Sequence, residues 1–274
     1  MAYDADVSFD YADQTVLITG ASSGIGAEFA TMLAERGASL VLVARRFDRL
    51  TDLAAKLHRA QGISVCVIAA DLTSPTAATD LRETIENRGI RITSLINNAG
   101  FGTFGAFVGE DLARLTDEIA VDITAPVSLT HVFLPDLLEN GHGFVINVAS
   151  MAAYTPAPRM AVYAAAKAFV LSFTEALWAE TRGSGVAVFA LSPGATSTEF
   201  NAVVGTEDAT AGATMRTPMD VVSTALKHLD RRNPGPSVVD GPTNRIGAAV
   251  SRLPSRRMSV TMMNRLTDPE RRTR

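Results

Sequence analysis

Residues 15–26 read TVLITGASSGIG, an apolar strand-like run followed by a glycine-rich loop and the start of a helical pattern. Gly20, Gly24 and Gly26 fall where a backbone must turn tightly, approach a diphosphate and pack a helix against a strand. The free N–H groups and the positive dipole end of the following helix suit an anion. Glycine-rich loops are common, and this one lacks the Gly-Lys-Ser/Thr of a nucleoside triphosphatase. Its strand–loop–helix context therefore carries the prediction of a dinucleotide-phosphate site.

The same strand-then-helix order repeats along the chain. Apolar runs expected as strands lie at 15–20, 39–44, 64–71, 92–100, 143–150, 185–194 and 237–240. Helical patterns separate them at about 25–36, 46–61, 75–88, 111–139, 158–182 and 218–231. Runs that are apolar throughout indicate strands of a parallel sheet that is covered on both faces. We predict an α/β fold, a single doubly wound Rossmann domain with a seven-stranded parallel sheet and helices on both faces.

Cap residues agree with these helix ends. Gly37, Gly62 and Gly89 stand where a glycine often follows the last turn of a helix. Ser74-Pro75 and Thr217-Pro218 each predict an N-cap followed by proline at the first helical position.

Composition is typical of a globular protein. The 274 residues can bury a substantial core, and 47% of them are apolar and 20% charged. A single cysteine, Cys66, excludes an intramolecular disulfide, fits a reducing compartment and offers no metal cluster. Because one cysteine cannot form a metal cluster, we expect no bound metal. Because the sequence shows neither a signal-like apolar core nor a membrane-spanning run, we expect a cytoplasmic protein.

Charge is unevenly distributed over a net value of −4. Residues 245–274 hold eight arginines against two acidic residues, a net charge of +6, which leaves −10 for the rest. Such asymmetry can mark an interaction segment. We divide the chain into an acidic N-terminal tail (1–12), a Rossmann-type domain (13–244) and a basic C-terminal extension (245–274).

The alanine-rich helical stretch VYAAAKAF, residues 162–169, carries a tyrosine and a lysine four positions apart. Tyr163 and Lys167 therefore share one helix face. With four tyrosines and three lysines in the chain, a chance pair is expected about 0.04 times. An ammonium beside a phenol lowers the pKa of the phenol, which suits proton transfer near neutral pH. A core tyrosine beside a lysine that reaches solvent along the helix is the alternative.

The second expected strand ends at Ala44 and is followed by Arg45 and Arg46, with no carboxylate before Asp48. At this edge an acidic residue accepts the ribose hydroxyls of NAD, whereas arginine suits the 2′-phosphate of NADP. We predict NADP(H) as the cofactor, with NAD(H) less favoured. A solvated helix start is the alternative reading of the two arginines.

Several further motifs follow in order. Thr-Gly-x-x-x-Gly-x-Gly stands at 19–26, Asn-Asn-Ala-Gly at 97–100, Ser150 thirteen residues before Tyr163, and Pro-Gly at 193–194. Together with Tyr-x-x-x-Lys they resemble the short-chain dehydrogenase/reductase family over about residues 13–240. The stretch NAGFGTFGAF and the chain length are similar to bacterial members known as general ketone or aldehyde reductases.

The resemblance implies a Ser-Tyr-Lys site that reduces a moderately hydrophobic ketone or aldehyde with NADPH, or oxidises the secondary alcohol. Tyr163 would exchange a proton with the carbonyl oxygen, Lys167 would lower the pKa of Tyr163 and bind the nicotinamide ribose, and Ser150 would orient the carbonyl. The hydride chemistry belongs to the cofactor. The implied cofactor contacts are Gly20, Ser22, Ser23, Gly24, Ile25, Gly26, Arg45, Arg46, Asp71, Leu72, Asn98, Ala99, Gly100, Tyr163, Lys167, Pro193, Gly194 and Thr198.

The chain departs from the family at Asp122, in VDITAPVSLT, where the resemblance implies an asparagine that positions a water near the lysine. An ionised aspartate only accepts hydrogen bonds. Its charge would raise the pKa of Lys167 if the two are close, so we keep Asp122 in the predicted catalytic set. Alternatively, Asp122 bonds local backbone only. The departure leaves open a second function, an NADP(H)-binding regulatory or interaction protein with little catalysis.

The long segment 195–216 follows Pro-Gly and is predicted to be a substrate lid. Aromatic and methionine side chains near the motifs are candidates for an apolar pocket. We expect at most three of these six to meet substrate, since such residues more often fill cores. They are Phe101, Phe104, Phe107, Met151, Tyr154 and Met160.

The helical stretch 160–179 carries only two charged residues, Lys167 and Glu175, so it needs cover on every side. We expect the same helix of a second subunit to provide part of it, in a homodimer or homotetramer, as is common in the family. The tail 251–274 fits packing across that assembly, or disorder. Peripheral membrane contact is less favoured because Pro254 interrupts the tail, and the acidic body disfavours nucleic acid.

Overall fold

A computed structural model describes residues 9–205, 214–251 and 253–268. Seven parallel strands form one sheet in the order β3-β2-β1-β4-β5-β6-β7. The predicted doubly wound α/β domain is confirmed. The strands are β1 (Thr15–Thr19), β2 (Ser39–Ala44), β3 (Val65–Ala69), β4 (Ser94–Asn97), β5 (Gly143–Val148), β6 (Val186–Ser192) and β7 (Ser237–Val239).

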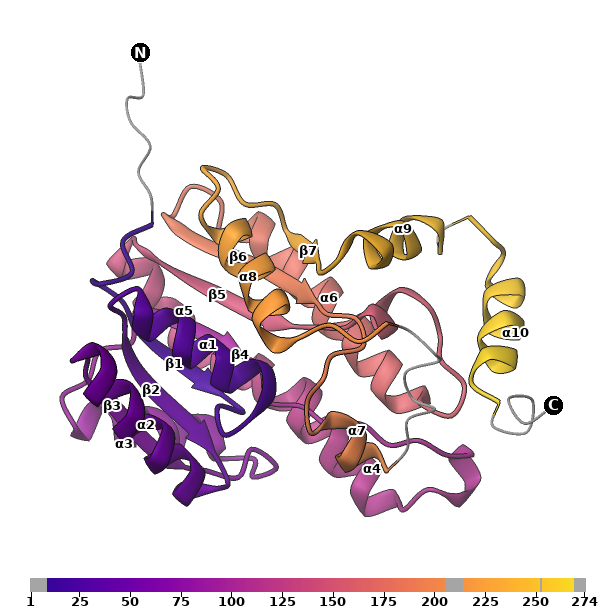
Figure 1. The fold of residues 1–274 in the computed structure, drawn as a ribbon, viewed down its shortest axis with the longest axis horizontal. Helices are drawn as coiled ribbons and strands as arrows, with labels where there is room; N and C mark the ends of the chain where they lie inside the picture. The colour runs from indigo at the N-terminus through magenta and orange to yellow at the C-terminus, as the bar shows by residue number, and fades with distance from the viewer. Residues whose placement is uncertain (1–8, 206–213, 252, 269–274) are drawn as a thin grey trace, which may run out of the picture.

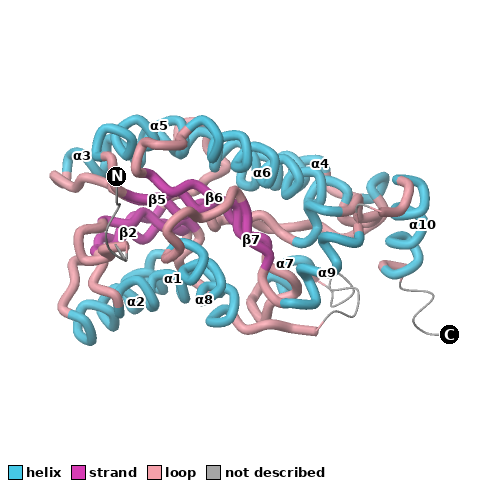
Figure 2. Tube along the Cα trace, turned by 90° about the horizontal axis from the view of Figure 1, so that it is seen from above, coloured by secondary structure: helices cyan, strands magenta, loops and turns pink. Residues whose placement is uncertain are grey.

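Helices cover both faces of the sheet, as Figure 2 shows. One face carries α1 (Gly24–Glu35), α2 (Phe47–Gln61) and α8 (Pro218–Leu229). The other face carries α3 (Ala77–Asn87), α5 (Ala125–Asn140) and α6 (Ala161–Glu180). Two further helices, α4 (Leu112–Ile119) and α7 (Phe200–Val204), follow the ends of β4 and β6. The last two, α9 (Pro242–Val250) and α10 (Arg256–Leu266), extend away from the body (Figure 1).

Strand order reverses beside β1, which positions the site. Val16 of β1 pairs with Leu40 of β2 on one side and with Ser94 of β4 on the other. The crossovers from β1 and β4 therefore run in opposite directions and leave a crevice at the carboxyl ends of these strands. The glycine-rich loop after β1 and the Asn-Asn-Ala-Gly segment after β4 meet there.

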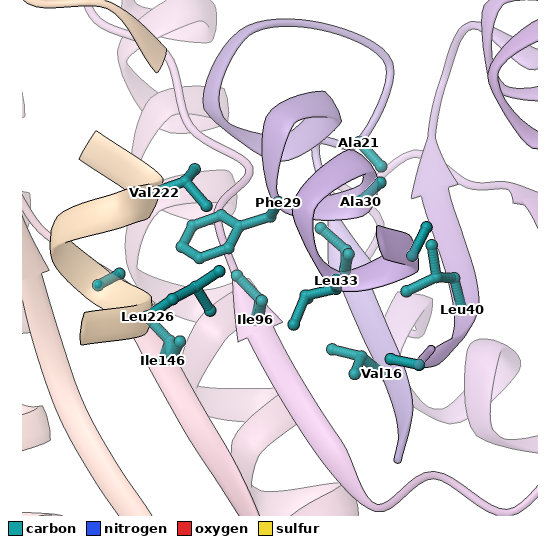
Figure 3. Close-up of a cluster of buried hydrophobic side chains, with 14 of the residues drawn as sticks. Val16, Ala21, Phe29, Ala30, Leu33, Leu40, Ile96, Ile146, Val222 and Leu226 are labelled. Carbon is teal, nitrogen blue, oxygen red and sulfur yellow. The ribbon is translucent and has the colours of Figure 1, made fainter. Parts of the chain in front are cut away.

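The core under α1 and α8 centres on Phe29, whose side chain is fully buried. Figure 3 shows its ring between Val222 and Leu226 of α8 and the strand residues Ile96 and Ile146. These contacts join two helices that are almost 200 residues apart to the middle of the sheet. The apolar runs in the sequence thus form the two-sided core that a parallel sheet requires.

The long helical pattern at 111–139 is three segments rather than one helix. A π-helix, Ala120–Thr124, separates α4 from α5. Pro126 explains the break, because it has no N–H to donate to the carbonyl of Asp122 four residues earlier. The wider turn carries the buried Asp122.

Most of the expected caps are present. Gly37, Gly62 and Gly89 have φ of +90°, +70° and +66°, the left-handed backbone that glycine adopts freely. Thr217 forms a capping box with Asp220.

The Ser74-Pro75 prediction is wrong by two residues, since Thr76 is the N-cap of α3. The backbone N–H of Thr76 points to the Ser74 hydroxyl at 3.4 Å, so Ser74 and Pro75 form the turn before the helix.

Two helices in the C-terminal region were not predicted, and α9 crosses the boundary proposed at residue 244. The domain limits and the membrane contact stay predictions. Residues 1–8, 252 and 269–274 lie outside the described residues. Within the part of the chain that the structure describes, no helix is long and apolar enough to cross a membrane.

Replacing Phe29 by alanine should lower the free energy of unfolding by about 3–5 kcal/mol, because it opens a cavity between α1, α8 and the sheet. Phe47→Ala is the matched control, since that ring is 53% exposed and should cost less than about 1 kcal/mol. Urea unfolding measures both. Equal losses in the two variants would contradict the assigned core.

Candidate active site

The loop between β1 and α1 needs its glycines for steric reasons. Gly20 and Gly24 have φ of +66° and +55°. A Cβ added to Gly26 would lie 2.4 Å from the carbonyl oxygen of Gly20 and 2.5 Å from Nδ2 of Asn98. Only glycine lets α1 start this close to the loop, which leaves the first turn of α1 facing the crevice.

Asn98 and Thr19 fasten this loop to the end of β4. The Asn98 side chain donates from Nδ2 to the carbonyl oxygen of Thr19 at 3.0 Å. The backbone N–H groups of Asn98 and Ala99 both donate to the Thr19 hydroxyl, at 3.0 and 3.1 Å. The predicted cofactor residues of the two strands are therefore one connected unit.

The start of α1 offers a donor set that fits a phosphate. Ser23 is the N-cap, and its side chain makes no capping hydrogen bond. The Arg46 guanidinium donates to the hydroxyls of Ser22 and Ser23, at 3.0 and 2.8 Å. A cation, two hydroxyls and a helix N-terminus at one place suit the phosphates of a dinucleotide. Arg45 beside them is exposed.

Glu199 was missed by the sequence reasoning. Its carboxylate pairs with Arg46 at 2.7 Å and with Arg49. Hydrogen bonds from Arg49 and Arg46 lower the pKa of Glu199 to about 2. All three side chains are about half exposed. No local pattern in the sequence joins residues that are 153 positions apart.

The last two predicted cofactor residues on this side follow β3. Asp71 is exposed and accepts a hydrogen bond from the backbone of Thr73 at 3.1 Å. Leu72 is buried. Both lie at the same edge of the sheet as the glycine-rich loop, because parallel strands end at a common edge.

Tyr163 and Lys167 lie on the first turns of α6 and are both buried. Ser150 follows β5 and caps a short 3-10 helix, Met151–Tyr154, by accepting from the backbone of Ala152 at 3.1 Å. The Ser150 hydroxyl is close enough to the Tyr163 phenol to lower the pKa of that phenol. The structure thus brings the three predicted side chains together.

Lys167 is held from three directions. Its Nζ donates to the carbonyl oxygen of Val148 at 3.2 Å and lies 3.0 Å from Asp122 Oδ2 in a buried ion pair. It is also 5.6 Å from the centre of the Tyr163 ring. Asp122 Oδ1 accepts from the backbone N–H of Phe101 at 3.0 Å. Asp122 therefore contacts the lysine as well as backbone, so the backbone-only alternative is excluded.

Burial dominates the titration of these groups. Burial raises the pKa of Tyr163 above its usual value, and the Lys167 charge opposes that rise without cancelling it. We predicted a lowered phenol pKa; the sign of the lysine's effect holds, but the net direction is reversed. Burial also lowers the pKa of Lys167, yet Asp122 and Tyr163 outweigh it and the net direction is upward. Lys167 is therefore a stable cation.

The first part of the predicted lid lies over the crevice. Thr198 packs on Gly24, where an added Cβ would be 3.0 Å from Thr198 Cγ2. The Phe200 ring, which the sequence reasoning missed, lies 5.2 Å from the Tyr163 ring. Residues 206–213 of the predicted lid are outside the described residues.

The two described ends of the predicted lid are joined to each other. Backbone hydrogen bonds of 2.8 Å join Ser197 and Ala195 to Arg216. The Arg216 guanidinium forms two hydrogen bonds, of 2.9 and 3.0 Å, with the buried Asp240. This bidentate pair holds the C-terminal end of the predicted lid against Asp240, the residue that follows β7.

Pro193 and Gly194 connect β6 to neighbouring parts of the site. The Pro193 carbonyl accepts from the backbone of Met151, next to Ser150, at 2.8 Å. A Cβ added to Gly194 would lie 2.3 Å from Asn244 Nδ2 of α9, so the glycine admits α9 at close range.

The six candidate pocket residues divide into different environments. Phe104 and Met160 pack with Tyr163 and Phe200. Phe107 is 66% exposed, and the Tyr154 hydroxyl lies 3.4 Å from that of Ser192. The half-buried Phe101 lies under the Arg114 guanidinium, and Met151 lies near α9.

Arg159 connects the C-terminal region to the site. Among the described non-glycine residues it alone has a positive φ, +70°. Its carbonyl accepts from Gly105, and its guanidinium pairs with Asp268 at 3.4 Å and donates to Asn264 of α10. The loop before α6 is thereby tied to α10.

A parallel sheet of this order, with a glycine-rich loop at its crevice, defines a dinucleotide-binding α/β protein. The short chain dehydrogenase family profile matches residues 14–209. Sulfoacetaldehyde reductase 2 of Chromohalobacter salexigens is 37% identical over 215 residues, 77% of this chain and 84% of that protein. The chain belongs to the short-chain dehydrogenase family and is an oxidoreductase of CH–OH and C=O groups.

Two solved structures are similar over most of the chain. A short-chain dehydrogenase from Sphingobium yanoikuyae in complex with NADPH has 36% identity and a TM-score of 0.78, covering 88% of this chain and 92% of that one. A bulky-bulky ketone specific alcohol dehydrogenase from Comamonas testosteroni has 31% identity and a TM-score of 0.73, covering 87% and 92%. A nicotinamide cofactor follows from this family and fold.

Asp122→Asn should retain or increase turnover, because the amide can still accept from Phe101 and is the residue that the family resemblance implies. The free energy of unfolding at neutral pH should nevertheless fall by about 3 kcal/mol, since Lys167 loses its buried partner. Steady-state kinetics and urea unfolding test the two parts. A loss of turnover of more than about tenfold would contradict the first part.

Proposed function

We propose that this protein reduces a moderately hydrophobic ketone or aldehyde with NADPH, or oxidises the corresponding secondary alcohol, at a Ser150-Tyr163-Lys167 site. The observation that carries the proposal is the meeting of these three side chains at the end of β5 beside the glycine-rich loop, with Tyr163 and Lys167 buried and Ser150 partly buried. When bound, a nicotinamide cofactor supplies or accepts the hydride.

The roles of the side chains follow from their contacts. Tyr163 donates its phenol proton to the carbonyl oxygen, and a raised pKa keeps that proton in place until the oxygen gains charge. Ser150, whose hydroxyl lies close enough to the phenol to lower its pKa, donates a second hydrogen bond to the carbonyl oxygen. The Lys167 cation stabilises the phenolate that remains.

An apolar substrate is favoured by the side chains around the phenol. Phe104, Met160 and Phe200 pack with Tyr163. They offer a partly buried apolar wall, of the kind that takes hydrocarbon groups on a carbonyl. The similarity to an alcohol dehydrogenase specific for bulky-bulky ketones supports the same choice. A sulfonate substrate would instead require a cationic partner at this wall.

NADP(H) is the proposed cofactor because Arg46 already binds both loop hydroxyls and lies at the edge where a 2′-phosphate is recognised. The similar structure in complex with NADPH supports it. Glu199 pairs with both Arg46 and Arg49, which leaves one net positive charge at this cluster. A phosphate has to compete with this carboxylate.

We further propose a homodimer or homotetramer, in the cytoplasm. Phe169 on α6 is 41% exposed and stacks on Phe173, and Leu138 on α5 is 38% exposed. These apolar side chains lie on two neighbouring helices of one face, where a second subunit would cover them. The single cysteine supports a reducing compartment.

Tyr163→Phe should lower kcat/KM for NADPH consumption by about 100-fold or more on any accepted carbonyl, because the phenol proton is lost. NADPH binding, followed by fluorescence, should stay within about threefold. A panel of aliphatic, aromatic and steroid-like ketones and aldehydes is the substrate set. Tight binding without turnover anywhere in the panel would favour the binding-protein alternative instead.

Replacing Arg45 and Arg46 by alanine should weaken NADPH and 2′,5′-ADP by about tenfold or more and leave NADH nearly unchanged. Glu199→Gln should have the opposite effect, tightening 2′,5′-ADP by about threefold, because a competing carboxylate is removed. Calorimetric titration measures each constant. Equal weakening of NADPH and NADH in the arginine variant would argue against NADP preference.

A further inference from the structure

A second carboxyl group lies buried one helical turn from Asp122, the partner of Lys167, and has no part in the proposed chemistry. Glu118, near the end of α4, has 0% exposure, and Asp122, in the π-helix, has 1%. Glutamate is almost never fully buried without a partner. Four residues and one helical turn separate the two, so they lie on the same side of the chain.

Each of these carboxylates fastens one residue of the loop after β4. The Thr103 hydroxyl donates to Glu118 Oε2 at 2.9 Å, and the Phe101 N–H donates to Asp122 Oδ1 at 3.0 Å. Gly102 lies between these two and packs on the Tyr163 ring, where an added Cβ would be 3.1 Å from Cδ2. The pair therefore sets how the loop meets the catalytic tyrosine.

The remaining oxygen of each group accepts no hydrogen bond within the described residues. These atoms are Glu118 Oε1 and Asp122 Oδ2. Oδ2 is compensated by the Lys167 ammonium at 3.0 Å, whereas Oε1 has no hydrogen-bond or ion-pair partner among the described residues. An unpaired buried carboxylate oxygen is costly, and adding a proton is the usual remedy.

The charges in this region point the same way. With both carboxylates ionised, two anions would face one cation, Lys167, in a place closed to water. Burial raises the pKa of Glu118 to about 7, and the charges of Asp122 and Glu110 add to the rise while Thr103 opposes it. Tyr163 and Lys167 on α6 feel the charge of Glu118 in turn. Burial raises the pKa of Asp122 as well, but the Lys167 ammonium 3.0 Å away opposes that rise, whereas Glu118 has no ion pair among the described residues. A neutral Glu118 therefore leaves a balanced Asp122–Lys167 pair.

We propose that Glu118 is a positioning residue that holds the single proton of a Glu118–Asp122 pair, so that Asp122 stays ionised against Lys167. When Glu118 loses this proton, a second negative charge acts on Tyr163 and makes its phenol harder to ionise. The state of Glu118 thus sets the pH range of the tyrosine. This inference rests on the proposed Ser150-Tyr163-Lys167 site.

Glu118→Gln mimics the protonated group at the same size and keeps an acceptor for Thr103. In the wild type the Tyr163 phenol has to ionise beside a charged Glu118 above neutral pH. In the variant that charge is absent, so the apparent pKa of Tyr163 in the kcat/KM profile should fall by about half a unit or more. Asp117→Asn, an exposed residue of the same helix, removes an equal formal charge and should leave the profile unchanged.

Thermal unfolding tests the proton without any substrate. Because folding raises the pKa of Glu118, the stability from its bound proton is present at low pH and is lost as pH rises through about 7. The melting temperature of Glu118→Gln minus that of the wild type should therefore increase from about pH 5 to about pH 8. Thr103→Val removes the hydroxyl that donates to Glu118 and lowers its pKa. In that variant the pKa of Glu118 should be higher still, so the loss of stability with rising pH should occur at higher pH.

The two measurements separate the inference from the proposed function. A melting difference that is constant with pH, or a Glu118→Gln profile that overlays the wild type, overturns the role of Glu118. If no carbonyl is turned over, the proposed function fails first. The phenolate absorbance of Tyr163, taken as wild type minus Tyr163→Phe, then replaces kinetics, and an unchanged titration in Glu118→Gln overturns the inference.

Discussion

The buried ion pair between Asp122 and Lys167 is the constraint around which the site is built. Removing two charges from water is costly, and such a pair persists only when further hydrogen bonds satisfy both groups. Phe101 donates to the aspartate, and the lysine donates to Val148. The pair therefore requires the loop after β4, the π-helix, the end of β5 and α6 to meet at one point. Tyr163, four residues before the lysine, is positioned by the same requirement.

A second set of charges organises the opposite wall of the crevice. Arg46 joins the glycine-rich loop to Glu199, just before α7. Arg216, which follows the predicted lid, pairs with Asp240 just after β7. Unlike the pair at Lys167, the Arg46 contact is half exposed, so it is weaker and more easily exchanged for an anionic ligand. The Asp122–Lys167 pair is thus shielded from water, whereas the Arg46–Glu199 pair is open to solvent and to ligands.

Part of this arrangement is common to the family, and part of it is formed by residues that differ from the family motifs or lie outside them. The glycine-rich loop, the Asn98 brace and the Ser-Tyr-Lys cluster occur where the family motifs stand. Asp122 stands where the family resemblance implies an asparagine, and Glu118 and the link from Arg159 to α10 lie outside the family motifs. They contact the loop facing Tyr163 and the loop before α6, the two segments next to the proposed site.

The sequence alone predicted the succession of seven strands and intervening helices along the chain, the doubly wound class, most caps and the residues proposed for catalysis and phosphate binding. These features rest on local patterns, namely apolar runs, glycines that need a left-handed backbone and residues four apart on one helix. Tertiary structure alone decided that Pro126 turns one predicted helix into three segments around Asp122, and that Glu118 is buried. It also decided that Arg46 meets Glu199 and that burial outweighs Lys167 in the pKa of Tyr163. Such outcomes depend on distance and exclusion of water between residues far apart in the chain, which no local pattern encodes.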